Sequence, residues 1–77
     1  QTTMYTHGTI QIENETFTYD AKHFDEPSEY GIEGGRISKL GIRKGREVVL
    51  NYDRGWVIEP ETEGAQLALL AICQKLN

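Results

Sequence analysis

The sequence predicts an α+β domain: a four-stranded antiparallel meander sheet with one C-terminal helix packed on one face, in the order β-β-β-β-α. Three observations support this fold class. Apolar and polar residues alternate in the first third of the chain, a second alternating region surrounds a Lys-Gly pair, and the C-terminal segment repeats its apolar residues at helical spacing. A chain of 77 residues is long enough for one small domain, so residues 1–77 are expected to fold as a unit.

Residues 7–24 are predicted to form the first hairpin, because apolar side chains recur every second residue on either side of a short polar connection. Asn14 is the expected turn residue, since asparagine tolerates a positive φ. The residues expected to face the core are Ile10, Ile12, Phe17, Tyr19 and Ala21.

Residues 36–52 are predicted to form a second hairpin that turns at Lys44-Gly45, where glycine accepts the left-handed conformation. Ile37 is out of phase with the apolar residues that follow it, which predicts a bulge near Ser38 or Lys39. The residues expected to face the core are Leu40, Ile42, Val48, Leu50 and Tyr52.

Residues 53–58 allow two interpretations. Asp53-Arg54-Gly55 is either a turn into a short fifth strand or the site of a bulge in one long strand. We prefer the bulge or bend, because three residues make a poor independent strand. Trp56 is expected in or near the core, against Tyr52 and the helix, since its indole is the largest apolar surface in the chain.

The segment 60–77 is predicted to be a helix with Thr62 as its N-cap. Its expected core face consists of Ala65, Leu69, Ile72 and Leu76, flanked by Ala68 and Cys73. Leu67 and Leu70 fall on the opposite side of the helix. We therefore expect these two leucines to contact a protein partner, and a weak homodimer is the simplest form of that contact.

The connection 24–35 is expected to be an ordered loop. Tyr30 and Ile32 supply apolar contacts within it, and three glycines supply unusual backbone angles. Its acidic rim favours a basic protein partner. The candidate partner-binding residues are accordingly Glu29, Tyr30 and Ile32 in the loop, and Leu67 and Leu70 on the helix.

No combination of residues predicts catalysis. His7 and His23 are expected to be ordinary strand residues, and Cys73 a small hydrophobic residue of the helix. The histidines and the cysteine lack zinc-ligand spacing, so we expect no catalytic residue, no metal site and no cofactor. With a single cysteine, no leader-like start and no long apolar run, the sequence predicts a cytoplasmic protein that does not enter a membrane.

The net charge of −4 is unevenly distributed, because residues 36–54 form a basic block inside an acidic chain. This block is either an ordinary solvated strand surface or an anion-binding surface. The second interpretation makes nucleic acid a possible partner. The candidate nucleic-acid-binding residues are Arg36, Lys39, Arg43, Lys44, Arg46 and Arg54.

The motifs EPSEYGIEGGRISKL (26–40) and NYDRGW (51–56) resemble a family of short uncharacterised proteins of Gram-positive bacteria and their mobile elements. That resemblance implies a bacterial or phage origin and a cytoplasmic location, but no activity. The junction GWVIEPETEGAQLALL (55–70) is also similar to the single-stranded nucleic-acid-binding domain of transcriptional coactivators, which has four strands and a dimerising helix. That similarity is topological, because the first two strands here are rich in threonine and flanked by acids.

Two functions follow from these observations. The first is a non-enzymatic protein-interaction module that uses the loop or the exposed leucines. The alternative is a single-stranded nucleic-acid-binding domain that uses the basic hairpin 36–54, with Tyr52 or Trp56 stacking on bases. The overall acidity favours the first, because contacts to phosphate dominate nucleic-acid affinity.

Overall fold

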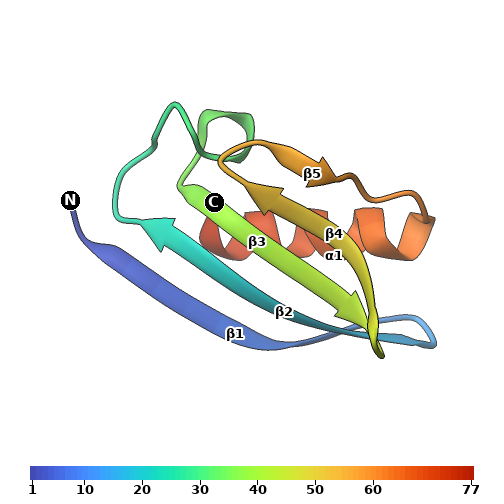
Figure 1. Ribbon diagram of the computed structural model, residues 1–77. Helices are drawn as coiled ribbons and strands as arrows, with labels where there is room; N and C mark the ends of the chain where they lie inside the picture. Colours follow the sequence, from blue (N-terminus) through green and yellow to red (C-terminus); the bar gives the residue numbers. More distant parts are fainter.

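The computed structural model describes residues 1–77 as a five-stranded antiparallel sheet with one helix on one face (Figure 1). The elements are β1 (Thr3–Ile12), β2 (Glu15–Phe24), the short 3₁₀ turn η1 (Ile32–Gly34), β3 (Ile37–Lys44), β4 (Glu47–Asp53), β5 (Trp56–Ile58) and α1 (Glu63–Leu76). The strands lie in sequence order from β1 to β5. The α+β class and the meander are confirmed, whereas the expected number of four strands is wrong.

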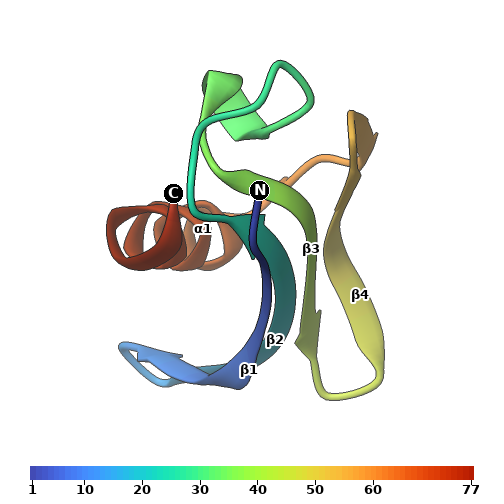
Figure 2. The same cartoon turned by 90° about the vertical axis from the view of Figure 1, so that its left-hand side faces the viewer.

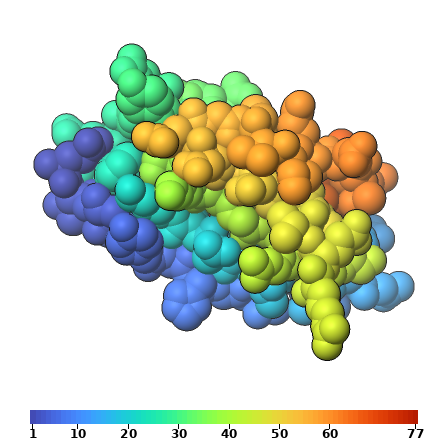
Figure 3. All heavy atoms as spheres, viewed as in Figure 1, coloured from blue at the N-terminus to red at the C-terminus, as the bar shows by residue number.

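The sheet curves around α1, which lies on its concave side and packs mainly on β1, β2 and β3 (Figure 2). Period-two alternation directs one side of each strand into this space, and helical spacing directs one side of α1 against it. The core residues are Phe17, Tyr19, Ala21, Ile32, Ile37, Leu40, Ile42, Leu50, Tyr52, Ala65, Ala68, Ile72 and Leu76. The opposite side of the sheet, which we call the open face, carries no other element (Figure 3).

The fifth strand is separate because the chain reverses at Asp53–Gly55, where Arg54 adopts a left-handed conformation with φ of 57°. The backbone N–H of Arg54 donates to the Ser38 carbonyl at 2.8 Å, which ties this turn to β3. Our preference for a bulge in one long strand was therefore wrong. A position for Trp56 in the core was also wrong: β5 lies beyond the strands that α1 mainly covers, and Trp56 is 39% exposed. Its ring contacts the Tyr52 ring edge-on, with centroids 5.0 Å apart.

Two bulges set which side chains face the core. Lys22 pairs with Lys39 but His23 pairs with Ile37, so Ser38 is the extra residue and the predicted bulge is confirmed. A second bulge at Val49 separates the Ile42–Leu50 pair from the Arg43–Val48 pair. That bulge turns Val48 outward and lets Val49 pack against the core, so the expected inward position of Val48 was wrong.

The ends of the first hairpin and of the helix test two local predictions. The positive φ of the β1–β2 turn falls on Glu13, at 53°, rather than on Asn14. The Thr62 hydroxyl accepts a hydrogen bond from the Ala65 N–H at 3.1 Å, which confirms Thr62 as the N-cap of α1. Leu69, which was expected in the core, is only partly buried at the margin of the helix contact.

The loop between β2 and β3 closes on itself. The Ser28 N–H donates to the Gly35 carbonyl at 2.9 Å, and a side chain on Gly31 would collide with the Gly35 backbone. Ile32 is buried beneath the loop at 2% exposure, as expected, but the Tyr30 ring is exposed. Tyr30 contributes its backbone instead, because its carbonyl accepts a hydrogen bond from the Tyr52 hydroxyl at 2.8 Å.

Asn77 connects the end of α1 to this loop and to β3. Its side-chain oxygen accepts from the Ile37 N–H at 2.8 Å, and its side-chain nitrogen donates to the Ile32 carbonyl at 3.0 Å. Its backbone N–H donates to the Cys73 carbonyl at 2.9 Å, which closes the last turn of the helix. One amide group therefore joins the end of the helix to the loop and to the start of β3, which lie 45 and 40 residues earlier in the chain.

We predict that Asn77→Ala lowers the free energy of unfolding by about 1–3 kcal/mol, because it leaves a backbone donor and a backbone acceptor without partners. Urea denaturation measures this change. Gln74→Ala, on the exposed side of the last turns of α1, is the matched control and is expected to be close to neutral. Equal effects of the two substitutions would contradict a bridging role for Asn77.

Candidate functional site

β1 is an unprotected edge of the sheet. Ten residues long, it lies at one end of the strand order, with no neighbour on its outer side. Its sequence TMYTHGTIQI contains no Lys, Arg, Asp, Glu or Pro, which are the residues that natural proteins place on edges to prevent strand pairing. β5, at the other edge, has three residues and is followed by Glu59 and Pro60. Only β1 therefore offers a long template for another strand.

Leu67 of α1 lies beside this edge. With Ile12 at the end of β1, it lines a small hollow of about 190 Å³ whose rim is acidic, because Glu13, Glu15 and Glu63 also line it. Leu70 follows on the outer side of the helix and is 58% exposed. Both leucines are exposed, as expected, although Leu67 at 37% is exposed less than Leu70. We call β1 together with Leu67 and Leu70 the β1 edge surface.

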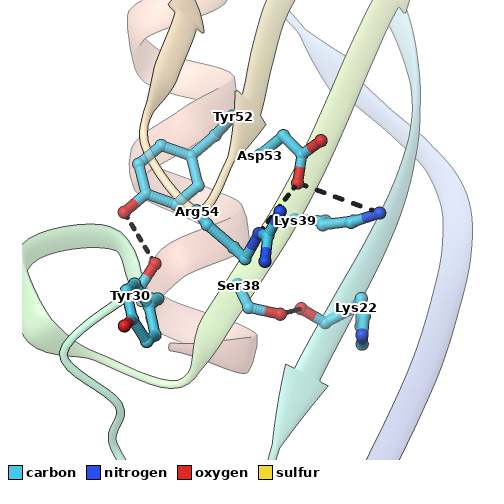
Figure 4. A network of polar contacts seen from close by, with 7 residues as sticks. All are labelled: Lys22, Tyr30, Ser38, Lys39, Tyr52, Asp53 and Arg54. Carbon is cyan, nitrogen blue, oxygen red and sulfur yellow. Dashed lines mark hydrogen bonds and ion pairs between the residues drawn. The ribbon is translucent and has the colours of Figure 1, made fainter.

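A basic cavity of about 460 Å³ lies at the other end of β2 and β3. β2, the loop, β3 and the β4–β5 turn each contribute to it. Its lining residues are Gln1, Lys22, Phe24, Ser28, Tyr30, Ser38, Lys39 and Arg54, with three basic residues and no acidic one. Figure 4 shows Tyr30 on the loop side and Lys22, Lys39 and Arg54 on the side of the sheet.

Only long, exposed contacts restrain the basic side chains of the cavity. The Asp53 carboxylate lies 3.8 Å from Lys39 Nζ and 3.7 Å from Arg54 Nε, and all three side chains are well exposed (Figure 4). Lys22 Nζ lies 5.8 Å from the centre of the Phe24 ring. These exposed pairs contribute little to stability, so the amino and guanidinium groups remain available to an anion.

The remaining basic residues of the hairpin 36–54 lie elsewhere. Arg36 Nε donates to the Asn77 carbonyl at 3.4 Å, and Lys44 Nζ forms an ion pair with Glu15 at 2.7 Å. Arg43 and Arg46 are exposed towards the far end of the hairpin, which projects beyond the other strands in Figure 3. Of the six predicted basic residues, Lys39 shares the basic cavity with Arg54 and a second hollow of about 290 Å³ with Arg43. Asp20 and Asp53 also line that second hollow, so one continuous basic surface does not form.

The three predicted partner-binding residues of the loop do not lie on one surface. Glu29 is exposed on the loop, and Tyr30 is exposed in the wall of the basic cavity. Ile32 belongs to the core, so its selection as a partner-binding residue was wrong. The sequence did not identify Lys22, Phe24 and Ser38, which line the basic cavity. Lys22 had a readable signal, because it alternates with Ala21 and His23 and must therefore face outward.

His23 is buried near the end of β2, just before the loop. Its Nε2 lies 2.8 Å from the Thr6 hydroxyl, and its Nδ1 has no hydrogen-bond partner. Burial, with a smaller contribution from the Arg36 guanidinium, lowers the pKa of His23 below its usual value. If the Thr6 hydroxyl were a nucleophile and His23 its base, a third group would be expected to orient the imidazole through Nδ1. No group contacts that atom.

Cys73 is half-buried on α1, and burial together with the Glu33 carboxylate raises the pKa of its thiol. A raised pKa keeps the sulfur in the less nucleophilic thiol form. No group of three or more His, Cys, Asp or Glu residues is arranged so that it could hold a metal ion. α1 has neither the length nor the apolar content to span a bilayer.

Comparison with protein families identifies the family of this chain. The family described as a domain of unknown function, DUF7678, matches residues 4–77, which includes every strand and the helix. The chain belongs to the DUF7678 family. Comparison with the curated proteins and with the solved structures gives no match. For this DUF7678 domain, the β1 edge surface and the basic cavity are therefore the features from which a function is argued.

We predict that His23 makes stability depend on pH. Because its pKa is lower in the folded than in the unfolded chain, the unfolded chain binds a proton first as the pH falls below about 6.5. The free energy of unfolding should therefore decrease between pH 7.5 and pH 5.5. In His23→Gln this decrease should be smaller.

Urea denaturation at the two pH values tests this expectation. His7→Gln, which changes an exposed histidine of the same hairpin, should keep the pH dependence of the original chain. An unchanged pH dependence in His23→Gln would show that another group is responsible.

Proposed function

We propose that this DUF7678 domain is a non-enzymatic protein-interaction module that associates through the β1 edge surface, and that its first partner is a second copy of the chain. The observation that carries this proposal is the ten-residue edge strand without a charged residue or proline. Every second residue of such an edge presents unpaired backbone N–H and C=O groups, which pair readily with another strand.

The absence of charge on β1 favours a second copy as the partner. In a two-fold pairing each residue of β1 faces a residue of the same strand, so a charged residue near the two-fold axis would be brought close to its own copy. Like charges opposite one another destabilise a strand pair. β1 avoids this repulsion, because His7 is its only titratable side chain apart from Tyr5.

The helix leucines supply the apolar part of the interface. Leu67 lies next to the end of β1, and Leu70 is on the same exposed side of α1. Burial of each leucine would contribute up to about 1.5–3 kcal/mol before the entropy cost of association is subtracted. A pairing with a small apolar contribution is expected to be a monomer–dimer equilibrium rather than an obligate dimer.

Single-stranded nucleic-acid binding is the second candidate, and the geometry favours it less. Lys39 and Arg54 support it, since they share a cavity with two aromatic rings. Arg36 and Lys44, however, are engaged with Asn77 and Glu15.

We also propose a bacterial origin and a cytoplasmic location for this domain. These two proposals rest on the motifs at 26–40 and 51–56 and on the single cysteine.

We predict that Thr9→Lys shifts the association equilibrium towards monomer, because lysine is a residue that protects natural edge strands. Sedimentation equilibrium over a range of protein concentrations measures this shift. Thr16→Lys is the matched control: it places the same charge on the same face of β2, a strand already paired on both sides. A Thr9→Lys variant that associates like the original chain would contradict the β1 edge as the interface.

We also predict that the double substitution Leu67→Glu, Leu70→Glu weakens association, because it places two carboxylates in the apolar part of the interface. Sedimentation of this variant beside the original chain measures the effect, and circular dichroism checks that α1 is retained. If both proteins are monomers at the highest soluble concentration, the leucines are ordinary surface residues and the dimer proposal fails.

A further inference from the structure

We propose that the basic cavity binds a nucleotide, with the phosphate group held by Lys39, Arg54 and Lys22 and the base stacked on Tyr30. The cavity opens at the opposite end of the first hairpin from the Leu67 hollow, so this inference does not depend on association through β1. Three kinds of observation carry it: the charge of the lining, the backbone of Arg54, and the way Tyr30 is held.

The charge of the cavity favours a phosphate group. Three basic side chains line it, and the one carboxylate that contacts them is that of Asp53. That carboxylate lies 3.8 Å from Lys39 Nζ and 3.7 Å from Arg54 Nε, which is longer than a close charge-assisted hydrogen bond. The basic groups outnumber the acidic one and retain unused donors. The hydroxyl of Ser28 is a further polar group in the lining.

Arg54 occupies a backbone position that favours glycine. Its φ is 57°, and its N–H donates to the Ser38 carbonyl, so the turn is held in this conformation by β3. A side chain in the left-handed region costs free energy that glycine would not. The arginine side chain is 70% exposed and has only the long contact with Asp53. Glu13 and Glu33 share this region, with φ of 53° and 52°, so the conformation alone does not mark a site. At Arg54 the held turn places an exposed guanidinium in the lining of the cavity.

Tyr30 presents its aromatic ring beside these charges from a backbone that two hydrogen bonds hold. Its N–H donates to the Ser28 hydroxyl at 3.2 Å, and its carbonyl accepts from the Tyr52 hydroxyl at 2.8 Å. The backbone is therefore held on both sides while the ring remains 55% exposed. An exposed aromatic ring on a held backbone, next to basic side chains, provides stacking for a base together with ion pairing for its phosphate. Phe24, whose ring lies near Lys22 Nζ, closes the other side.

The volume of about 460 Å³ lies within the range of cavities that bind small ligands. A free mononucleotide and one nucleotide of a single strand present the same chemistry, namely a phosphate joined to a planar base. The experiment distinguishes these two sources. It uses amide chemical-shift titration of the native chain with four probes: adenosine monophosphate, inorganic phosphate, adenosine and a short oligothymidylate.

We expect adenosine monophosphate to shift the amides of Ser28, Tyr30, Ser38 and Arg54, and to bind more tightly than phosphate or adenosine alone. Oligothymidylate binding at the same amides, more tightly and with a steep salt dependence, would identify a strand as the source. Phosphate binding as tight as adenosine monophosphate would overturn the role of the base. The absence of shifts at these amides with every probe would overturn the site.

Two variants separate a binding role from a structural one. Arg54→Gly should weaken binding of adenosine monophosphate by about tenfold or more, because a charge-assisted contact is lost. Its melting temperature should be unchanged or higher, because glycine relieves the backbone at this position. Arg46→Gln, which removes a positive charge in the distant β3–β4 turn, should leave the affinity unchanged. Equal affinities for all three proteins would contradict the proposal.

Discussion

The loop between β2 and β3 and the start of β3 both depend on the side-chain amide of Asn77 for their position. Its two hydrogen bonds join the end of α1 to the Ile32 carbonyl and to the Ile37 N–H, and these groups come from η1 and from the first residue of β3. The close approach of Gly35 to the Asn77 side chain leaves no space for a Cβ atom at that position. One polar group therefore fixes the path of a loop that has only one fully buried side chain, Ile32.

The position of the basic cavity follows from this anchor. The loop that Asn77 holds carries Ser28 and Tyr30, and β3, which begins at the same anchor, carries Ser38 and Lys39. The bulge at Ser38 places that residue at the margin of the sheet, where its carbonyl fixes the Arg54 turn. The cavity is thus assembled by backbone contacts, which keep its walls in place while leaving the charged side chains free.

Local chemistry was enough to predict much of the fold. Alternation identified Phe17 and Leu40 as core residues, and the capping preference of threonine identified the start of α1 at Thr62. The position of Val48 could not be predicted in this way. Val48 and Val49 are equally apolar, and only the pairing of β4 with β3 decides which one is the bulged residue.

The candidate sites were less accessible to sequence reasoning. Lys22, Tyr30 and Arg54 are separated along the chain and meet only because the meander and the loop bring them together. Grouping basic residues by sequence proximity correctly joined Lys39 to Arg43, which line one hollow, but it could not show that Asp20 of β2 lies between the strands' basic residues there or that Lys22 joins Lys39 and Arg54. The exposure of β1 depends on strand order, which alternation does not reveal. Its lack of charge, by contrast, is visible in the sequence.

The unequal edges of the sheet also limit how far the molecule can polymerise. Pairing of β1 with its own copy is closed by two-fold symmetry, so it uses the same edge in both chains and leaves only the β5 strands outermost. β5 is three residues long, and Pro60, which lacks an N–H, follows shortly after it. A filament needs two edges that each accept a strand, and this chain has one. Its long edge strand, which lacks charged side chains, is therefore compatible with a discrete assembly rather than with fibre growth.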